Sequence, residues 1–112
     1  MQQVVDLQND KAFQRLDIEL LSISPDSVSD WKQTVTEMGI HLPVLSDDGN
    51  RVAGMYGVMR WRMGNEPGHT FVLVDREGRV AWLHDYGAPE HGGLMYVEPG
   101  KIIREVGGRL SS

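Results

Sequence analysis

The sequence predicts an α/β fold, because strand-forming and helix-forming segments alternate along its 112 residues. The clearest strand is Thr70–Asp75, where Phe-Val-Leu-Val fills every position between the polar ends, a pattern typical of a strand buried on both faces. A turn that contains Gly78 separates it from Arg79–His84, so the two segments predict an antiparallel β-hairpin. Apolar residues at helical spacing over 28–38 predict a helix.

The first half of the chain is predicted to run helix, strand, helix. Residues 2–15 carry apolar residues at approximately helical spacing, and Ile18–Ile23 is rich in branched aliphatic residues, as strands are. Ser27 is a good N-cap for a helix over 28–38, and Asp30 is placed to complete a capping box. That helix is expected to turn one apolar face inward, formed by Val28, Trp31, Val35 and Met38.

Weaker signals mark the middle of the chain. Leu42–Leu45 is predicted to be extended, and Ser46–Asn50 is polar and typical of a turn that caps a following helix. A short helix over 50–56 is expected to bury Val52, Met55 and Tyr56, and Met38 and Met55 are interpreted as core residues. Residues 57–69 are rich in Gly and Arg and are predicted to be irregular, with a short strand near Val58–Trp61.

The chain is predicted to end in a loop and a helix. Residues 85–97 follow the hairpin as a Gly- and Pro-containing loop, and a helix is expected to begin near Pro99. Its buried stripe is predicted to be Ile102, Ile103, Val106 and Leu110. The order helix, strand, helix, insertion, hairpin, helix over residues 1–112 predicts one thioredoxin-like α/β sandwich domain.

Composition excludes several classes of function. The formal net charge is −5 and the pI is about 5.2, which argues against a nucleic-acid groove; the only basic-aromatic cluster is Arg60-Trp61-Arg62. No apolar run approaches the roughly 20 residues that a membrane helix needs. The N-terminus lacks the features of a signal peptide, so the cytoplasm is the default expectation. The absence of cysteine excludes disulfides and thiolate metal sites.

No motif for a metal or a cofactor stands out. The four histidines, His41, His69, His84 and His91, form neither an H-x-x-x-H nor an H-E-x-x-H pattern, and ordinary polar histidines are the preferred interpretation. Asp47 and Asp48 lack the remaining ligands of a calcium loop and are interpreted as a helix-capping turn. No glycine-rich phosphate loop follows a strand. We therefore expect neither a metal nor a cofactor.

Four short segments in register resemble motifs of the peroxiredoxins, the alkyl hydroperoxide reductase and thiol-specific antioxidant family. Leu20–Asp26 is similar to the motif V-S-x-D at a strand end, Leu42–Asp47 to F-P-L-L-S-D, and Val52–Val58 to V-A-x-x-Y-G-V. Thr70–Asp75 is similar to the family's hairpin strand. The resemblance implies a thioredoxin-like fold and thiol-dependent peroxide reduction, with a protein reductant that it does not identify.

Two departures from the family pattern bear on activity. The family carries a P-x-x-x-T-x-x-C loop before its first helix, and the resemblance implies that this chain begins inside that helix, without the first strand, the catalytic loop and the cysteine. Many members place an arginine where this chain has Gly68; the resemblance makes Arg60, Arg62, His69 and Thr70 the candidates near the active-site edge. We therefore expect no catalytic residue in this chain and no peroxidase activity from it alone.

The absent strand has a physical consequence. By the resemblance it would lie between the strands at 18–23 and 70–75, and without it both would expose unpaired backbone groups, each costing roughly 1–3 kcal/mol if buried. We expect the two strands either to pair directly in antiparallel sense or to meet a partner, with a homo-oligomer through the exposed sheet edge as the prediction. The alternatives are a non-catalytic binding or assembly module that uses this edge or the Arg60–Arg62 surface, and, more remotely, an enzyme that uses His69 and His84.

Overall fold

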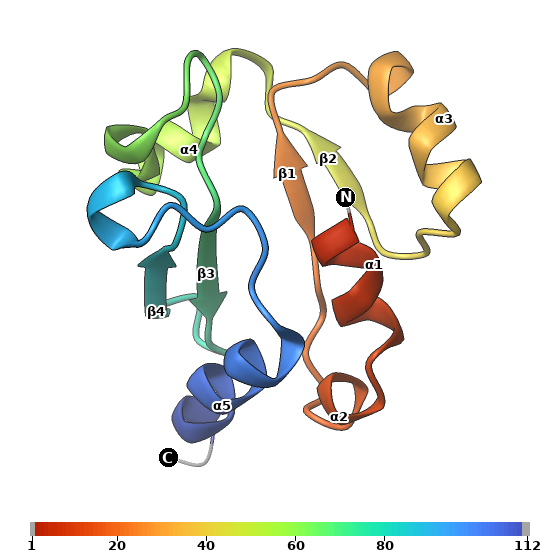
Figure 1. Cartoon of the computed structure of the whole chain (residues 1–112), viewed down its shortest axis with the longest axis vertical. Helices are drawn as coiled ribbons and strands as arrows, with labels where there is room; N and C mark the ends of the chain where they lie inside the picture. The colour runs from red at the N-terminus through yellow and green to blue at the C-terminus, as the bar shows by residue number, and fades with distance from the viewer. Residues whose placement is uncertain (1, 111–112) are drawn as a thin grey trace.

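The four strands form two separate two-stranded sheets (Figure 1). The structure is a computed structural model and describes residues 2–110. β1 (Ser22–Ser24) pairs in parallel with β2 (Val44–Ser46), and β3 (Thr70–Val74) pairs in antiparallel with β4 (Val80–Asp85). The predicted α/β class and hairpin are confirmed, but the predicted burial of the 70–75 strand on both faces is wrong, because Leu73 is buried while Val72 and Val74 are 37% and 43% exposed. Direct pairing of the segments around β1 and β3, one of the predicted ways to close the sheet, does not occur among the described residues.

The predicted first helix is two helices. α1 (Gln2–Asn9) ends before Asp10, and α2 (Lys11–Gln14) begins after it. Asp10 has an extended backbone, and its carboxylate accepts a hydrogen bond from the Phe13 N–H at 3.0 Å, as an N-cap does. This cap starts a new helix where the sequence predicted a continuous one.

β1 is shorter than the predicted strand at 18–23. Asp17 adopts a left-handed backbone conformation with φ of 56°. The segment that follows directs Ile18 and Leu20 against the main hydrophobic core, and only Ser22–Ser24 pairs with β2. β2 is likewise shifted toward the C-terminus of the predicted segment 42–45.

α3 (Val28–Met38) confirms the predicted helix and both of its ends. Ser27 and Asp30 form the capping box, and Gly39 closes the helix with a left-handed φ of 67°. Trp31, Val35 and Met38 are half-buried, but Val28 is exposed, so the inward face is narrower than predicted.

The region after β2 differs most from prediction. Turns of 3-10 helix at Asp48–Asn50 (η1) and Val58–Trp61 (η2) flank α4 (Arg51–Met55), so the predicted short strand near Val58 is wrong. The buried face was also assigned wrongly: Ala53 is buried, whereas Met55 is 79% exposed and Val52 and Tyr56 are 38% exposed. The capping prediction is confirmed, because the Asp47 carboxylate accepts the N–H groups of Val52 and Ala53, each at 2.9 Å.

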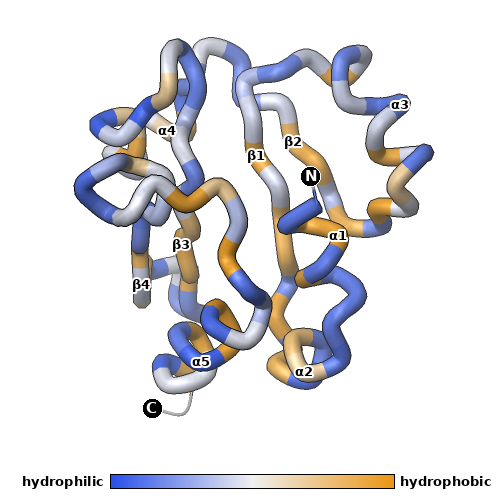
Figure 2. Tube along the Cα trace, viewed as in Figure 1, coloured by the Kyte–Doolittle hydropathy of each residue, from blue (hydrophilic) through white to orange (hydrophobic). Residues whose placement is uncertain are grey.

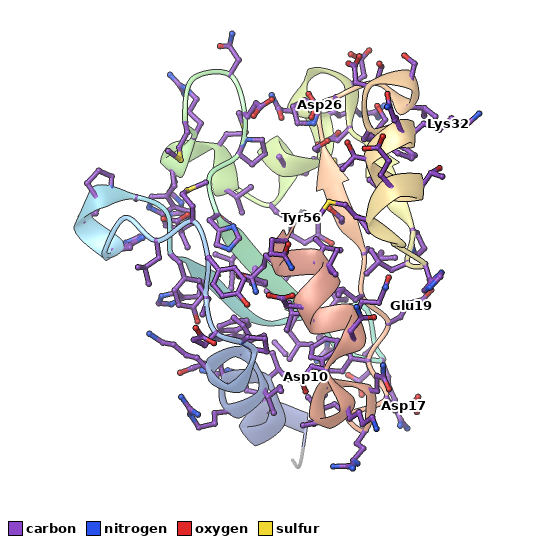
Figure 3. All side chains as sticks on the ribbon, turned by 45° about the vertical axis from the view of Figure 1, so that its right-hand side comes forward. Asp10, Asp17, Glu19, Asp26, Lys32 and Tyr56 are labelled. Carbon is purple, nitrogen blue, oxygen red and sulfur yellow. The ribbon has the colours of Figure 1, made fainter. Side chains whose placement is uncertain are left out.

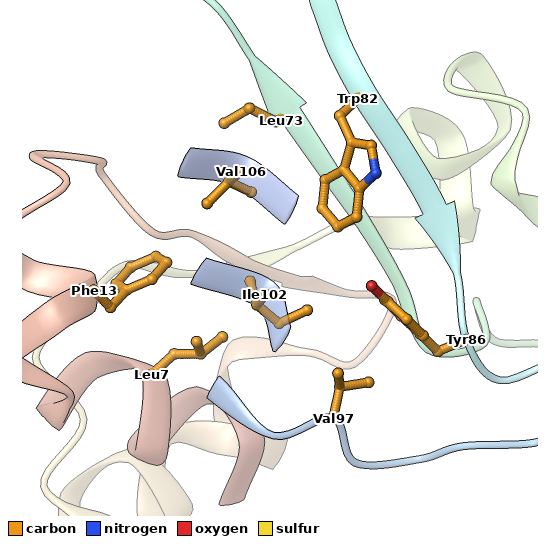
Figure 4. Packing of buried hydrophobic residues seen from close by; sticks show 8 residues of the cluster. All are labelled: Leu7, Phe13, Leu73, Trp82, Tyr86, Val97, Ile102 and Val106. Atoms are coloured by element: carbon orange, nitrogen blue, oxygen red, sulfur yellow. The ribbon is translucent and has the colours of Figure 1, made fainter. Parts of the chain in front are cut away.

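The main core gathers around the C-terminal helix α5 (Pro99–Leu110), which follows a short 3-10 turn, η3 (Pro89–His91). Ile102 and Val106 of α5 lie between the N-terminal helices and the hairpin (Figure 4). The other buried members are Leu7, Phe13, Leu73, Trp82, Tyr86 and Val97. Ile102 and Val106 confirm the predicted stripe of α5, whereas Leu110 is 44% exposed.

Hydrophilic and apolar residues both reach the surface of this structure, since Leu21, Val28 and Met55 are 47%, 55% and 79% exposed. Figure 2 shows hydrophobic stretches along β1, β2 and β3, with hydrophilic residues concentrated in the turns and on the helices. Figure 3 places Lys32, Glu19 and Asp17 along one side of the molecule and Tyr56 nearer the centre of the view. None of the helices within residues 2–110 has the length and apolar character to cross a bilayer.

Candidate functional site

A buried carboxylate lies at the end of β4. Asp85 is 2% exposed and accepts hydrogen bonds on both oxygens. Its Oδ1 accepts the Thr70 hydroxyl at 2.8 Å, and its Oδ2 accepts the Ala88 N–H at 2.9 Å and lies 2.9 Å from Nδ1 of His91. These bonds tie the start of β3, the end of β4 and the following turn to one charged group.

The hydrogen bonds decide the charge state of Asp85. Burial alone would raise its pKa, since it disfavours the ionised form. The donors from Ala88, His91, Thr70 and the Gly87 backbone act in the opposite direction and hold the pKa of Asp85 below its ordinary value. The carboxylate is therefore ionised at neutral pH although it is buried, because every donor around it stabilises the charge.

His69 connects the hairpin to the first turn of α1. Its Nε2 lies 2.9 Å from Oε1 of Gln3, a buried side chain. The Gln3 side chain is oriented by Val97: its Oε1 accepts the Val97 N–H at 2.7 Å and its Nε2 donates to the Val97 carbonyl at 2.9 Å. Because this oxygen can only accept, Nε2 of His69 carries the proton and Nδ1 is left as an acceptor.

The environment of His69 keeps its ring neutral. Burial lowers the pKa of His69, and the charge of Asp85 opposes this effect only in part. Phe71 packs against the ring edge-to-face, with ring centroids 5.2 Å apart. His69 is thus a fixed, neutral imidazole beside the beginning of α1.

Gly68 cannot be replaced by the arginine that the family pattern would place there. A Cβ atom at Gly68 would lie 2.7 Å from the carbonyl oxygen of Trp61, a backbone atom that has no freedom to move aside. It would also lie 3.4 Å from Oδ1 of Asp85. The close approach of the Trp61 carbonyl to the segment before β3 therefore favours glycine, and an arginine side chain could enter only if the backbone there moved.

Of the two candidate arginines, Arg60 lies in η2 and Arg62 directly follows it. Arg60 is exposed; its Nε donates to the Gly57 carbonyl at 2.9 Å, and its guanidinium stacks over the Trp61 ring at 4.4 Å. Arg62 is exposed. Trp61 in turn meets His91 edge-to-face at 5.4 Å between ring centroids. Arg60 therefore contacts only its neighbours Gly57 and Trp61 in these bonds, while Trp61 contacts His91, which is hydrogen-bonded to Asp85.

The predicted site residues fall into two groups. Gly68, His69 and Thr70 lie together against Gln3 and Asp85, whereas Arg60 and Arg62 belong to the neighbouring surface. Sequence reasoning missed the parts played by three residues: Gln3, Asp85 and His91. Their contacts span from 3 to 94 positions of the chain. The contacts of Gln3 join segments too far apart for a local motif to mark them, whereas the contacts of Asp85 with Ala88 and His91 are local.

This arrangement can orient a polar group but supplies no attacking atom of its own. The sequence contains no cysteine. Within the described part of the chain, no group of three or more His, Asp and Glu side chains converges in a way that would hold a metal ion. What the site offers is a neutral imidazole, a hydroxyl and an ionised carboxylate near the first turn of α1.

The chain belongs to the AhpC/TSA family, the family of the peroxiredoxins, whose sequence profile matches residues 2–83. It is similar to the selenocysteine-containing peroxiredoxin PrxU of Peptoclostridium acidaminophilum, with 40% identity over 75 residues, or 61% of this chain and 36% of that protein. It is also similar to chloroplastic peroxiredoxin Q of Oryza sativa subsp. japonica and of Triticum aestivum, with 27% and 26% identity over 73 residues. The family resemblance predicted from the four segments is confirmed.

The chain spans about a third of the length of these curated relatives. The matched region covers 65% of this chain and 34% of each peroxiredoxin Q. The comparison therefore relates this chain to one part of those proteins.

Replacing Asp85 by asparagine should destabilise the fold. In D85N one carboxylate oxygen is replaced by an NH₂ group, which must point either toward the Thr70 hydroxyl or toward the Ala88 N–H and His91. Two donors then face each other, and the buried donor left without an acceptor costs about 1–3 kcal/mol. Urea unfolding at pH 7 measures this loss. The exposed Glu90 is the matched control, and E90Q should change the stability by less than about 0.5 kcal/mol.

The same variant has a pH signature. The pKa of Asp85 is lowered in the folded state, so its stabilising contribution is present above its unfolded pKa of about 3.9 and is lost as the pH falls through its folded pKa. The stability difference between wild type and D85N should shrink over that range. Equal stabilities at pH 7, or a difference that grows in acid, would contradict this account of Asp85.

The ring of His69 should titrate below about pH 6.5, the ordinary value for histidine. A lowered folded pKa means that His69 stabilises the fold least when it is protonated, so its contribution is lost as the pH falls below about 6.5. NMR of the ring protons measures the midpoint. Because the charge of Asp85 acts to raise the pKa of His69, D85N should move the midpoint lower still. A midpoint that rises in D85N would contradict this effect of Asp85, and a wild-type midpoint above about 6.5 would contradict burial as the dominant cause.

Proposed function

We propose that these 112 residues form a thioredoxin-like scaffold of a peroxide-reducing domain and do not reduce peroxide by themselves. Membership of the AhpC/TSA family and the parallel β1–β2 pair followed by an antiparallel hairpin support the architecture. One observation carries the proposed inactivity: the chain has no cysteine, and thiol-dependent peroxide reduction needs a thiolate nucleophile.

The methionines do not replace that nucleophile. Met55, Met63 and Met95 are 79%, 49% and 56% exposed, so peroxide can reach them. Oxidation of a thioether gives a sulfoxide, and reducing the sulfoxide back to the thioether requires a dedicated reductase. Each methionine therefore consumes peroxide once, which is damage and not turnover.

The attacking atom of a complete site would come from residues outside 1–112. The relative from Peptoclostridium acidaminophilum is named as a selenocysteine-containing peroxiredoxin, so selenium is a candidate beside sulfur. The contact between His69 and Gln3 supports a reacting position at the start of α1, where the backbone N–H groups of a helix are free to stabilise an anion. In this proposal His69 and Thr70 position groups beside the peroxide and do not attack it.

Peroxide consumption tests this proposal directly. The purified chain, given hydrogen peroxide and dithiothreitol, should consume no more peroxide than its six methionines allow, and the rate should then fall to that of buffer. Sustained turnover beyond that stoichiometric limit would contradict the proposal.

A gain-of-function fusion gives the complementary test. A strand-forming segment followed by the P-x-x-x-T-x-x-C pattern is joined directly before Gln2, and a matched fusion carries serine in place of the cysteine. The cysteine fusion should turn over peroxide with dithiothreitol and the serine fusion should not. Two folded fusions of equal, buffer-level activity would show that the scaffold is not one for peroxide reduction.

A second candidate function is a binding or assembly module. The observation that favours it is the pair of strand edges, on β1 and β3, that have no neighbouring strand among the described residues. The predicted homo-oligomer is one form of this candidate. Binding of another partner and self-association differ in which chain would occupy the space between the two edges.

A further inference from the structure

Two exposed histidines, His84 and His91, lie beside each other at the end of the hairpin, with ring centroids 6.2 Å apart. His84 belongs to β4, and His91 is the last residue of η3, the turn that follows. The Leu94 N–H donates to the Tyr86 carbonyl at 2.8 Å, so the segment between these two residues folds back toward β4. This fold-back brings the two imidazole rings together.

Asp85 orients the ring of His91. Nδ1 of His91 lies 2.9 Å from Oδ2 of the buried Asp85 carboxylate. Because the ionised carboxylate only accepts, Nδ1 of the neutral ring carries the proton and Nε2 keeps its lone pair. Histidines that bind metal ions usually donate their other ring N–H to a carboxylate or carbonyl in this way, which fixes the tautomer and makes the ligand nitrogen more basic. Within residues 2–110 no hydrogen bond engages Nε2 of His91.

The ring of His84 packs against two aromatic residues. It stacks on Trp82, with 6.1 Å between centroids and 9° between the ring planes, and its centroid lies 4.3 Å from that of Tyr86. Trp82 and Tyr86 are core residues that point toward α5 (Figure 4). These ring contacts use no nitrogen of His84, and no side-chain hydrogen bond to the described part of the chain does so either. Its nitrogens are therefore available to a ligand.

The separation of the two rings fits one shared ion. Bonds from Zn²⁺ to histidine nitrogen are about 2.0–2.1 Å long, and the ring centre lies about 1.1 Å beyond the nitrogen, so an ion bound to both rings holds their centroids at most about 6.4 Å apart. The observed 6.2 Å is within this limit. A tetrahedral angle at the ion brings the rings about 1 Å closer, a movement that rotation of the exposed His84 side chain supplies.

The ligand atoms select the kind of ion. Imidazole nitrogen suits Zn²⁺, Cu²⁺ and Ni²⁺, whereas Mg²⁺ and Ca²⁺ prefer oxygen ligands. The negative charge of Asp85 beside His91 favours a cation, and the guanidinium of Arg60, stacked on Trp61, opposes it in part. No third His, Asp or Glu among the described residues converges on the pair, so water completes the coordination shell and the site is weaker than a three-ligand site.

We propose that His84 and His91 form a surface site for a divalent transition-metal ion, with water as the remaining ligands. The sequence predicts no metal here, because no ligand spacing joins the two histidines, and the fold supplies the pairing instead. This inference goes beyond the proposed function, because it concerns metal binding and needs no peroxide chemistry.

Zinc titration of the intact chain, followed by NMR, tests the proposal. Added ZnCl₂ should shift the ring-proton signals of His84 and His91 together, with saturation at one ion per chain, while the signals of the exposed His41 stay in place. The same concentration of Mg²⁺ should shift none of them. Shifts confined to His41 or His69, equal shifts with Mg²⁺, or no saturation up to millimolar Zn²⁺ would overturn the proposal.

Matched variants separate this site from general binding to histidine. His84→Phe keeps an aromatic ring against Trp82 and Tyr86 but removes the ligand nitrogen, so it should weaken Zn²⁺ binding in calorimetry at least about tenfold. His41→Ala removes an exposed histidine elsewhere and should change the affinity less than about twofold. Circular dichroism checks that both variants are folded. Equal affinities of wild type and His84→Phe, or equal losses in the two variants, would contradict the site.

Two tryptophans provide an independent optical measurement. Trp61 meets His91 with ring centroids 5.4 Å apart, and Trp82 stacks on His84. Cu²⁺ quenches tryptophan fluorescence at short range and is bound more tightly than Zn²⁺ by the same ligands, so it should quench the chain saturably. The quenching should persist in Trp31→Phe, which removes the tryptophan of α3, and should weaken in His84→Phe. The reverse pattern would place the ion elsewhere and overturn the proposal.

Discussion

Packing around α5 joins two sheets that backbone hydrogen bonds do not connect. Ile102 and Val106 fill the space between the N-terminal helices and the hairpin, and Ile18 and Leu20 bring the segment before β1 against the same core. Hydrophobic contact is non-directional, so it holds the two sheets near each other without closing the space between their edges. A cleft of about 500 Å³ therefore remains between the two edges, and Gly68, His69 and Thr70 are among the residues that line it.

Two buried polar side chains give the apolar packing a defined geometry. Gln3 bonds to both backbone groups of Val97 and to His69, and so fixes the start of α1 against the hairpin and the loop before α5. Asp85 joins Thr70 to the turn after β4. The buried polar groups of both side chains are hydrogen-bonded, so these contacts define how the joined segments lie against one another.

Features that depend on local chemistry could be read from the sequence. The capping box of Ser27, the capping carboxylate of Asp47 and the hairpin all appear as predicted, because each depends on residues a few positions apart. The division at Asp10 was missed although it is local, since Asp10 caps the second helix through the Phe13 N–H. The exposure of Met55 was missed because it is decided by what the rest of the chain covers. The site contacts of Gln3 with Val97 and His69 join distant segments and leave no periodic signal.

The central claim is that β1 and β3 each have one free edge in the isolated chain, and amide hydrogen exchange tests it most directly. Corrected for intrinsic rates, the Thr70 and Val72 amides should exchange at least ~10-fold faster than those of Phe71 and Leu73, which bond to β4. Equal protection of all four amides would mean that the cleft is already filled by the chain or by a second copy, and would contradict the account.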